Sequence, residues 1–293
     1  MSHRAGFVNI IGNPNVGKST LMNALVGENL SIITPKAQTT RHRIPGILNG
    51  EDYQIVFSDT PGLLAPNYKL HESMLHLVET ALEDADILLI LVEVGQKDLE
   101  AEFLKKIEKT TVSCILLVNK IDQHEQSEVM KSLKYWQEKL PSAELLAISA
   151  SLGFNTGGVL ELIKEKLPEN PPYYPKDELT DKTMRFFVSE IIRKHIFLNY
   201  SKEVPYSCEV AIDSYKEAEN IIRISAIVFV TKETQRKIIL GYRGQAIKKV
   251  GTDARKEIET FVDSHVYIDL SVKVKKDWRN DEEMLKRMGY ELE

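Results

Sequence analysis

One short segment near the N-terminus restricts the fold more than any other feature of the chain. Residues 12–19 read GNPNVGKS, a full match to the pattern GxxxxGK[S/T], and they follow an apolar run, Gly6–Ile11. This pattern is typical of a loop that joins a strand to a helix and wraps its backbone N–H groups around a phosphate chain. Glycine lets the backbone come close, and the following helix adds the positive end of its dipole. The segment predicts an α/β fold of the P-loop NTPase type.

The side chains of this loop have separate expected roles. Lys18 should reach the β- and γ-phosphates, and the Ser19 hydroxyl should ligate Mg²⁺. The nucleotide-binding residues predicted here are Gly12, Asn13, Pro14, Asn15, Val16, Gly17, Lys18, Ser19 and Thr20.

A second phosphate-binding segment comes about 40 residues later, at the end of the apolar run Gln54–Ser58, and reads Asp59, Thr60, Pro61, Gly62. A carboxylate at a strand end can hold Mg²⁺ through a water, and the Gly62 N–H can approach the γ-phosphate. Thr40 lies in the polar stretch before the second predicted strand, and we expect it to close over the γ-phosphate as a Mg²⁺ ligand. Thr39 is the less favoured choice.

Leu63, the next residue, does not fit the usual pattern. Ras and the Gα subunits have a glutamine after this segment, which orients the attacking water. Leucine has no polar atom for that purpose. Either the chain does not hydrolyse nucleotide, or other groups hold the water.

Two further segments point to the base. Asn119, Lys120, Ile121 and Asp122 follow a predicted strand, and Ser149 and Ala150 follow the next one. A carboxylate such as Asp122 can accept both the N1–H and the exocyclic amine of guanine, whereas adenine would leave it without donors. A backbone N–H of the Ser149-Ala150 pair could reach the guanine O6. These segments favour GTP over ATP.

Alternation of short apolar runs with stretches of helical period continues to residue 167. It predicts a mostly parallel sheet covered by helices, and we assign residues 1–170 to a Ras-like GTPase domain. The predicted strands are Gly6–Ile11, Ile44–Leu48, Gln54–Ser58, Ile87–Val94, Cys114–Asn119 and Glu144–Ile148. The proline-rich sequence PENPPYYP then indicates a stiff linker, which we place at residues 171–180.

Residues 181–293 have the expected element order α-β-β-α-α-β, with two short helices broken at 241–244 and a further helix in Asp277–Arg287. The break reads GYRG, a GXXG loop, which in KH domains clamps the backbone of about four nucleotides. It lies in a stretch with eight basic residues against two acidic ones, residues 232–256. We therefore predict an α+β type II KH domain with the RNA-binding residues Gly241, Tyr242, Arg243, Gly244, Lys248 and Lys249.

Bulk properties limit the class of protein. The longest aliphatic run, Ile87–Val92, is far shorter than the roughly 20 residues that cross a bilayer, and the first residues show no signal-peptide pattern. Two cysteines, Cys114 and Cys208, lie in separate predicted domains and are expected to be free thiols. We expect a protein of a reducing compartment inside the cell.

Taken together, these segments resemble those of the Era family of bacterial GTPases over essentially the whole chain. The matching stretches are GNPNVGKST, KAQTTRHR, DTPG, NKID, SA, ILGYRGQAIKKVGTDARKEIE and VKVKKDWRND. The resemblance implies a monomeric, cytoplasmic, Mg²⁺-dependent GTPase that binds the 3′ end of 16S rRNA through its KH domain and acts in 30S subunit assembly. It also implies peripheral contact with the inner face of the cytoplasmic membrane.

Era resembles GTPases that have an aliphatic residue in place of the catalytic glutamine. In related potassium-activated GTPases an asparagine of the phosphate loop binds K⁺, and the matching residue is Asn15. The resemblance thus implies slow hydrolysis involving Lys18, Asn15, Thr40 and Gly62, with K⁺ as a second cofactor and with water held by backbone groups near Thr40 and Gly62. GTP would order the loops and permit RNA binding until hydrolysis. The alternative is a GTP-dependent RNA-binding scaffold in which hydrolysis is incidental.

Overall fold

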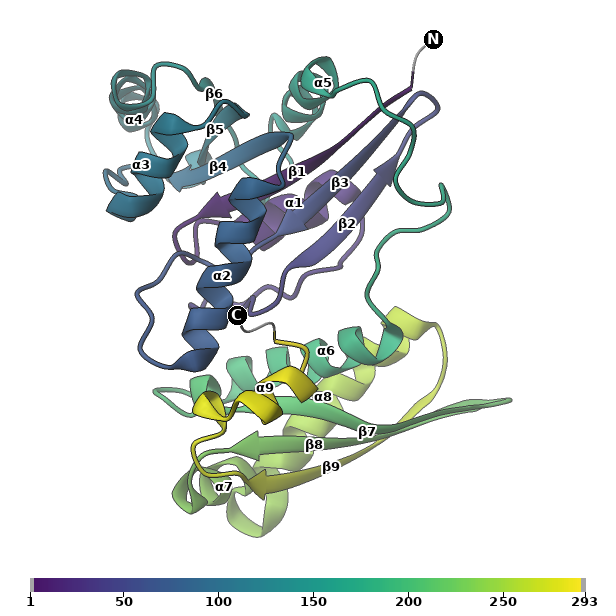
Figure 1. Cartoon of the computed structure of the whole chain (residues 1–293). Coiled ribbons are helices and arrows are strands. Elements are labelled where there is room, and N and C mark those ends of the chain that lie inside the picture. The colour runs from purple at the N-terminus through teal and green to yellow at the C-terminus, as the bar shows by residue number, and fades with distance from the viewer. Residues whose placement is uncertain (1–2, 291–293) are drawn as a thin grey trace. The chain divides into compact units, whose positions relative to one another are not determined.

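The computed structural model describes residues 3–290 and divides the chain into two compact units. The first ends at Asp181 and the second begins at Lys182, except that the short segment Tyr68–Leu70 is grouped with the second. Each unit has its own sheet, as Figure 1 shows. Among the described residues, no helix has the length and apolar character needed to cross a bilayer.

The first unit is built on a six-stranded sheet with the order β2-β3-β1-β4-β5-β6. Its strands are β1 (Arg4–Gly12), β2 (Ile44–Asn49), β3 (Tyr53–Asp59), β4 (Ile87–Glu93), β5 (Ser113–Asn119) and β6 (Glu144–Ala147). Only β2 runs antiparallel to its neighbour, β3. The predicted mostly parallel sheet is therefore confirmed.

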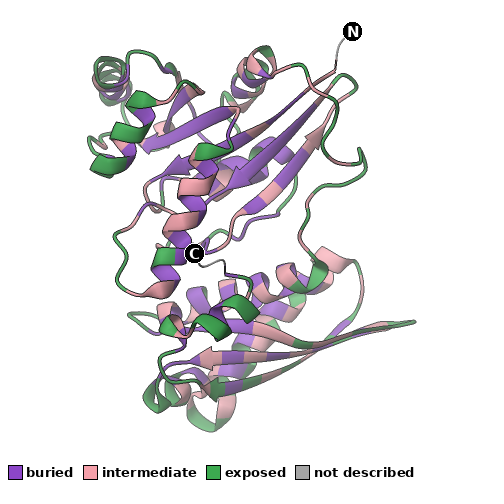
Figure 2. Ribbon diagram, viewed as in Figure 1, coloured by how far each residue is buried: buried purple, intermediate pink, exposed green. Residues whose placement is uncertain are grey.

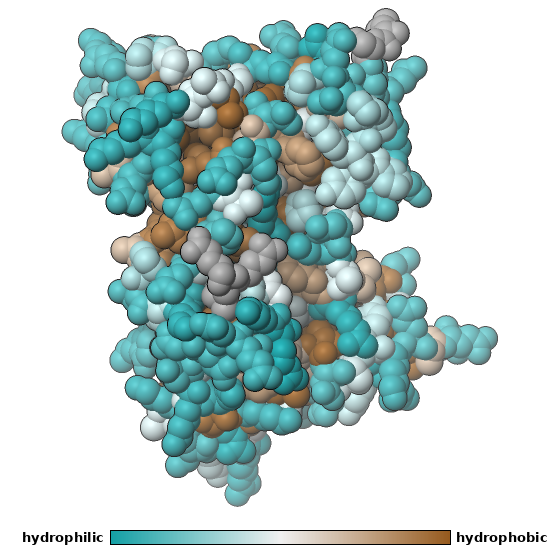
Figure 3. Space-filling model, viewed as in Figure 1, coloured by the Kyte–Doolittle hydropathy of each residue, from teal (hydrophilic) through white to brown (hydrophobic). Residues whose placement is uncertain are grey.

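The central strands β1, β3, β4 and β5 are almost fully buried, as the near-continuous apolar sequence of each strand requires when helices cover both faces (Figure 2). The covering helices are α1 (Lys18–Val26), α2 (Lys69–Glu83), α3 (Ala101–Lys109), α4 (Gln126–Lys139) and α5 (Thr156–Lys166). Helices α2, α3 and α4 pack in one core cluster around Phe103 and Trp136, while α1 packs against α5. Hydrophilic residues cover most of the face shown in Figure 3.

The proline-rich segment at residues 171–180 lies against β2 and β3 of this unit. Gln54 accepts hydrogen bonds from the Tyr173 and Tyr174 N–H groups, at 2.7 and 3.0 Å, and donates to the Tyr174 carbonyl at 2.8 Å. The Ile47 N–H donates to the Leu179 carbonyl at 2.8 Å. The buried Gln54 and the Ile47 N–H thus help to fix the course of the segment, which composition alone could not predict.

The second unit has a three-stranded sheet, β7 (Glu209–Ala218), β8 (Ile221–Val230) and β9 (Val266–Val274), in the order β7-β8-β9. Its helices are α6 (Met184–Asn199), α7 (Glu233–Leu240), α8 (Gln245–Val262) and the short α9 (Glu282–Arg287). The predicted order α-β-β-α-α-β is confirmed. The expectation of two short helices around the GXXG loop is wrong for α8, which has 18 residues because its apolar positions Ile247, Val250, Ala254 and Ile258 continue one buried stripe.

Candidate nucleotide and nucleic-acid sites

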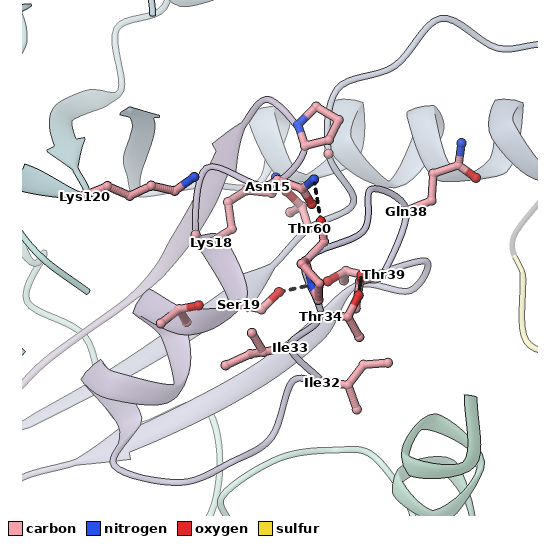
Figure 4. Close-up of a pocket in the computed structure, with 16 residues that line it drawn as sticks. Asn15, Lys18, Ser19, Ile32, Ile33, Thr34, Gln38, Thr39, Thr60 and Lys120 are labelled. Atoms are coloured by element: carbon pink, nitrogen blue, oxygen red, sulfur yellow. Dashed lines mark hydrogen bonds between the residues drawn. The ribbon is translucent and has the colours of Figure 1, made fainter. Parts of the chain in front are cut away.

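A cavity of about 560 Å³ lies at the carboxyl end of β1, between the phosphate loop and residues 32–40 (Figure 4). Parallel sheets of this kind place their ligand sites at the carboxyl ends of the strands. The loop makes a tight turn there: Gly17 has φ 101°, and a Cβ atom on it would lie 2.4 Å from the Asn119 side chain. Gly62 is also packed closely, since a Cβ atom added to it would lie 2.8 Å from the Pro14 backbone. The two predicted phosphate-binding segments therefore meet at this cavity.

Lys18, the first residue of α1, is buried at the floor of the cavity. Its ammonium donates to the carbonyl oxygens of Gly12 and Asn13, at 3.0 and 2.9 Å. Burial lowers the pKa of Lys18 to about 8, although the nearby Asp59 acts in the opposite direction. The structure thus holds a poorly solvated cation where a phosphate would be received.

Asp59, Ser19 and Thr40 form a compact oxygen cluster beside this lysine. The Ser19 hydroxyl donates to Asp59 Oδ2 at 2.7 Å, and the Thr40 hydroxyl donates to the same oxygen at 3.2 Å. The two hydroxyl oxygens are 2.9 Å apart. Burial raises the pKa of Asp59, and its second oxygen, Oδ1, is buried without a hydrogen-bond partner.

This cluster fits a hard divalent cation. Mg²⁺ prefers oxygen ligands and keeps several waters, and an orphaned carboxylate oxygen inside a protein is costly unless a cation or water meets it. The structure brings together all three predicted metal residues, Ser19, Thr40 and Asp59. Thr39 has another role. Its hydroxyl lies 2.6 Å from the Thr34 hydroxyl and donates to the Lys36 carbonyl at 2.6 Å, so it forms hydrogen bonds within the loop itself.

Asn15 lies at the rim of the cavity, with a left-handed φ of 62°. Its side-chain amide donates to the Pro35 carbonyl oxygen at 3.3 Å, so the phosphate loop and the 32–40 loop meet through it (Figure 4). An amide oxygen and a backbone carbonyl are ligands that a monovalent cation can use. Asn13, by contrast, turns outward and donates to the Asp98 carbonyl at 3.1 Å.

Leu63 lies beside this site but does not face the cavity. Its side chain is 5% exposed and belongs to the core cluster with Ile11, Val78 and Ile90. Its N–H donates to the Gly12 carbonyl at 3.2 Å, which holds the Asp59–Gly62 segment against the phosphate loop. Leu63 therefore contributes to packing, and its side chain cannot orient the water.

The predicted base-binding segments are joined by Asn119. Its side-chain amide donates to the Val16 carbonyl at 2.8 Å, and its oxygen accepts the Ala150 N–H at 2.9 Å. Asn119 thus positions the phosphate loop and the 149–150 turn relative to each other. Lys120 has a φ of 65° and pairs with Glu93 at 2.5 Å, while the carboxylate-bearing Asp122 is exposed at the start of a 3₁₀ turn.

The expected contact from the Ser149-Ala150 pair to guanine O6 needs correction. The Ser149 N–H is donated to the Phe154 carbonyl at 3.2 Å, and the Ala150 N–H is donated to Asn119. Both groups are used to close the 149–154 turn and to fix it to β5. A contact to O6 in this arrangement would have to come from another group of the turn.

In the second unit the GXXG loop separates α7 from α8 as predicted. Gly241, Arg243 and Gly244 all have positive φ, at 69°, 48° and 76°. Tyr242 is 74% exposed, and the Arg243 guanidinium lies 5.3 Å from its ring centre. The loop therefore presents an aromatic ring and a cation together.

A groove of about 390 Å³ runs along α8 and the edge strand β9. Its lining residues are Ile247, Lys248, Gly251, Thr252, Arg255, Tyr267, Ile268 and Leu270. Lys248 is part of it, as predicted, but Lys249 does not line it and instead pairs with Asp253 at 2.5 Å. One helical position rotates a side chain by about 100°, so adjacent lysines face different directions. Arg255 and Tyr267 also line the groove. Neither was among the predicted RNA-binding residues, because both lie outside the GXXG loop and the lysine pair that follows it.

Known protein families match both units of the chain. A family described as "50S ribosome-binding GTPase" matches residues 7–120, and the KH domain family matches residues 203–279. GTPase Era of Clostridium kluyveri is 43% identical over 292 residues, with 98% of this chain and 99% of that protein covered. GTPase Era of Geobacter metallireducens is 41% identical, with 98% of each chain covered.

Two solved structures are similar over nearly the whole chain. One is Era in complex with MgGDPNP and nucleotides 1506–1542 of 16S ribosomal RNA, with a TM-score of 0.95, 36% identity and coverage of 99% of this chain and 100% of that one. The other is a variant of Aquifex aeolicus Era bound to GDP and AlF₄⁻, with a TM-score of 0.93, 35% identity and the same coverage. Near-complete coverage at this identity establishes that the chain belongs to the Era family of GTPases.

Proposed function

We propose that this protein binds GTP and GDP with Mg²⁺, hydrolyses GTP slowly, and binds the 3′ end of 16S rRNA through its KH unit during assembly of the 30S subunit. The observation that carries the proposal is the Ser19–Thr40–Asp59 oxygen cluster beside Lys18, in a chain that also has a groove next to its GXXG loop. The similar Era structure with bound MgGDPNP and a 16S rRNA fragment supports the same pairing of ligands. We place the protein in the cytoplasm as a monomer, with peripheral membrane contact as a secondary property.

Several residues at the cavity have a task in this reaction. Lys18 and the N–H groups of the phosphate loop bind the β- and γ-phosphates, and Ser19, Thr40 and Asp59 would hold Mg²⁺, which offsets the negative charge that develops on these phosphates. Because Leu63 is in the core, the attacking water is held by backbone groups of the loops that carry Thr40 and Gly62. Without a glutamine at position 63 to orient the water, we expect turnover to be slow.

The function is tested by turnover of GTP and ATP in Mg²⁺ and in excess EDTA. We expect phosphate release from GTP alone, and only with Mg²⁺. Equal turnover of ATP would contradict the base assignment, and Mg²⁺-independent turnover would contradict the role of the oxygen cluster.

Raising the pH should weaken GDP binding. Free Lys18 has a pKa of about 8, and a bound phosphate favours its charged form, so binding takes up a proton above that pH. Affinity is therefore full well below pH 8 and should fall by about fourfold between pH 7 and pH 8.5. Calorimetric titrations at both pH values test this. A constant affinity would show that Lys18 keeps its charge throughout.

We also propose that K⁺ binds between Asn15 and the Pro35 carbonyl and stimulates hydrolysis. A cation beside the transferred phosphate acts where other GTPases place an arginine, so replacing Na⁺ by K⁺ should raise turnover at least about tenfold. Asn15→Ala should remove the difference between the two ions. Asn13→Ala is the matched control, because that amide donates to Asp98 instead. Equal turnover of the wild-type protein in Na⁺ and K⁺ would rule out the cation site.

A further inference from the structure

Arg43 is the last residue of the family-typical stretch KAQTTRHR, and none of the roles assigned above uses it. It precedes β2 directly and lies three residues after Thr40. Its guanidinium meets side chains from three other parts of the first unit, namely Asn9 on β1, Ser58 on β3, and Asp84 just after α2. We refer to these four residues as the Arg43 cluster.

The hydrogen bonds in this cluster need the forked shape of arginine. Two nitrogens, Nη1 and Nη2, donate to the two oxygens of Asp84 at 2.5 and 3.0 Å. Nη2 also donates to Asn9 Oδ1 at 3.1 Å, and Nε donates to the Ser58 hydroxyl at 3.1 Å. A lysine could supply the charge but not this planar set of donors.

Asn9 makes the cluster rigid. Its side chain is fully buried, and its amide donates to the Ala81 carbonyl at 2.6 Å and to Asp84 Oδ1 at 2.7 Å. The oxygen of the same side chain accepts from Arg43. The strand β1, the end of α2 and the arginine are therefore joined through one amide whose two ends are both hydrogen-bonded. The ion pair itself is only partly shielded, with side-chain exposures of 19% for Arg43 and 44% for Asp84.

The cluster is adjacent to the metal-binding residues but on the other face of the sheet. Ser58 and Asp59 are consecutive on β3, and consecutive side chains of a strand point to opposite faces. Asp59 accepts a hydrogen bond from Thr40, and Ser58 accepts one from Arg43. The segment from Thr40 to Arg43 is thus attached to β3 at two points, one on each face.

Only one of these two attachments needs to change when nucleotide binds. A γ-phosphate and Mg²⁺ would draw the Thr40 hydroxyl into metal coordination. The hydrogen bonds of Arg43 lie on the other face of the sheet, so nucleotide binding need not break them. A loop whose end is already fixed loses less conformational entropy on closing than a loop with a free end. The Arg43 cluster would hold that end, and through Asp84 it also holds the far end of α2, the helix that follows the Asp59–Gly62 segment.

We infer that Arg43 is a positioning residue for GTP: it fixes the base of the Thr40 loop so that Thr40 can close on the γ-phosphate and its metal at low cost. This inference rests on the proposed function, because it assumes GTP binding with Thr40 as a metal ligand. A residue that only stabilised the fold would affect the binding of both nucleotides alike. GDP has no γ-phosphate for the loop to close on, so loss of Arg43 should affect the two nucleotides unequally.

The test compares affinities for GDP and for the non-hydrolysable analogue GDPNP, both with Mg²⁺, by fluorescence titration. Arg43→Lys should weaken GDPNP binding by about tenfold, the size expected for losing charge-assisted hydrogen bonds at a partly exposed site, and should change GDP binding by less than about twofold. Ser58→Ala removes only the hydrogen bond between Arg43 and β3, and it should weaken GDPNP binding by about threefold.

Arg4→Lys is the matched control. Arg4 also belongs to the first unit and donates to the carbonyls of Lys164 and Glu165, at 3.0 and 2.9 Å, away from the cavity. It should leave both affinities unchanged. Equal losses for GDP and GDPNP in Arg43→Lys, or no loss for either, would overturn the inference while the function stands. A wild-type protein that binds neither nucleotide would overturn the proposed function and the inference with it.

Discussion

Asp122→Asn should convert the protein from a guanine-binding to a xanthine-binding one. A carboxylate accepts the N1–H and the exocyclic amine of guanine, while an amide can donate to the carbonyl oxygen that xanthine has in place of that amine. Each lost charge-assisted hydrogen bond costs about 1.5–3 kcal/mol, so GTP affinity should fall by at least about 100-fold. Affinity for xanthosine triphosphate should rise in the same variant.

Competition titrations with the two nucleotides measure this exchange. Glu125→Gln is a suitable control, because Glu125 is an exposed carboxylate three residues away with no capping bond to its helix. It should keep the wild-type preference. If Asp122→Asn also kept it, the base would be read by another group, and the role of the Asn119–Asp122 segment would be limited to joining β5 to the phosphate loop.

The second large effect concerns RNA. Arg243→Ala combined with Lys248→Ala should weaken binding of a short single strand by about 10- to 100-fold, because each basic residue removed takes away one phosphate contact. The dependence of affinity on salt should become shallower by about two units of slope, one for each contact. Affinities measured at three or more salt concentrations give both quantities.

Lys249→Ala provides the control for this pair. Lys249 is adjacent to Lys248 in the sequence, yet it lies outside the groove and pairs with Asp253. It should bind RNA nearly as well as the wild type. The reverse result would be weak RNA binding by Lys249→Ala and normal RNA binding by the double variant. It would place the RNA on another face of α8.

Local sequence motifs predicted which residues lie together at the phosphate loop and where the GXXG loop lies, for a physical reason. A phosphate loop, a strand-end aspartate and a GXXG turn each need particular residues at fixed spacing, so the pattern survives in one sequence. Ser19, Thr40 and Asp59 are far apart in the chain, but each motif implies the others, and the structure brings the three together. The α/β and KH-type element orders follow from apolar periodicity in the same way.

What the sequence could not predict depends on side-chain direction and on long-range pairing. The sequence shows that Leu63 cannot hold water, but only the packing of α2 shows that it belongs to the core cluster. The Ala150 N–H is engaged by Asn119, which is 31 residues away. The Arg43 cluster joins four chain segments, and no short sequence pattern predicts it.

Because Leu63 replaces the usual glutamine, two accounts of GTP hydrolysis are to be compared: it ends the interaction with RNA, or it only accompanies that interaction. In the timer account, GTP closes the Thr40 loop, favours RNA binding, and is hydrolysed to end it. In the scaffold account, GTP state matters for RNA affinity but a block of hydrolysis has no further effect. A variant with slowed hydrolysis and normal nucleotide affinity separates the two, because only the timer account predicts delayed release of RNA.

The central claim is that one chain links its nucleotide state to its RNA affinity. The most direct test is the affinity of a short strand with the sequence of the 16S rRNA 3′ end, measured in parallel with GDP and with GDPNP in Mg²⁺. The account predicts clearly tighter RNA binding in the GDPNP state. Equal affinity in the two states would contradict it, and would leave a GTPase and an RNA-binding domain that share a chain without acting on each other.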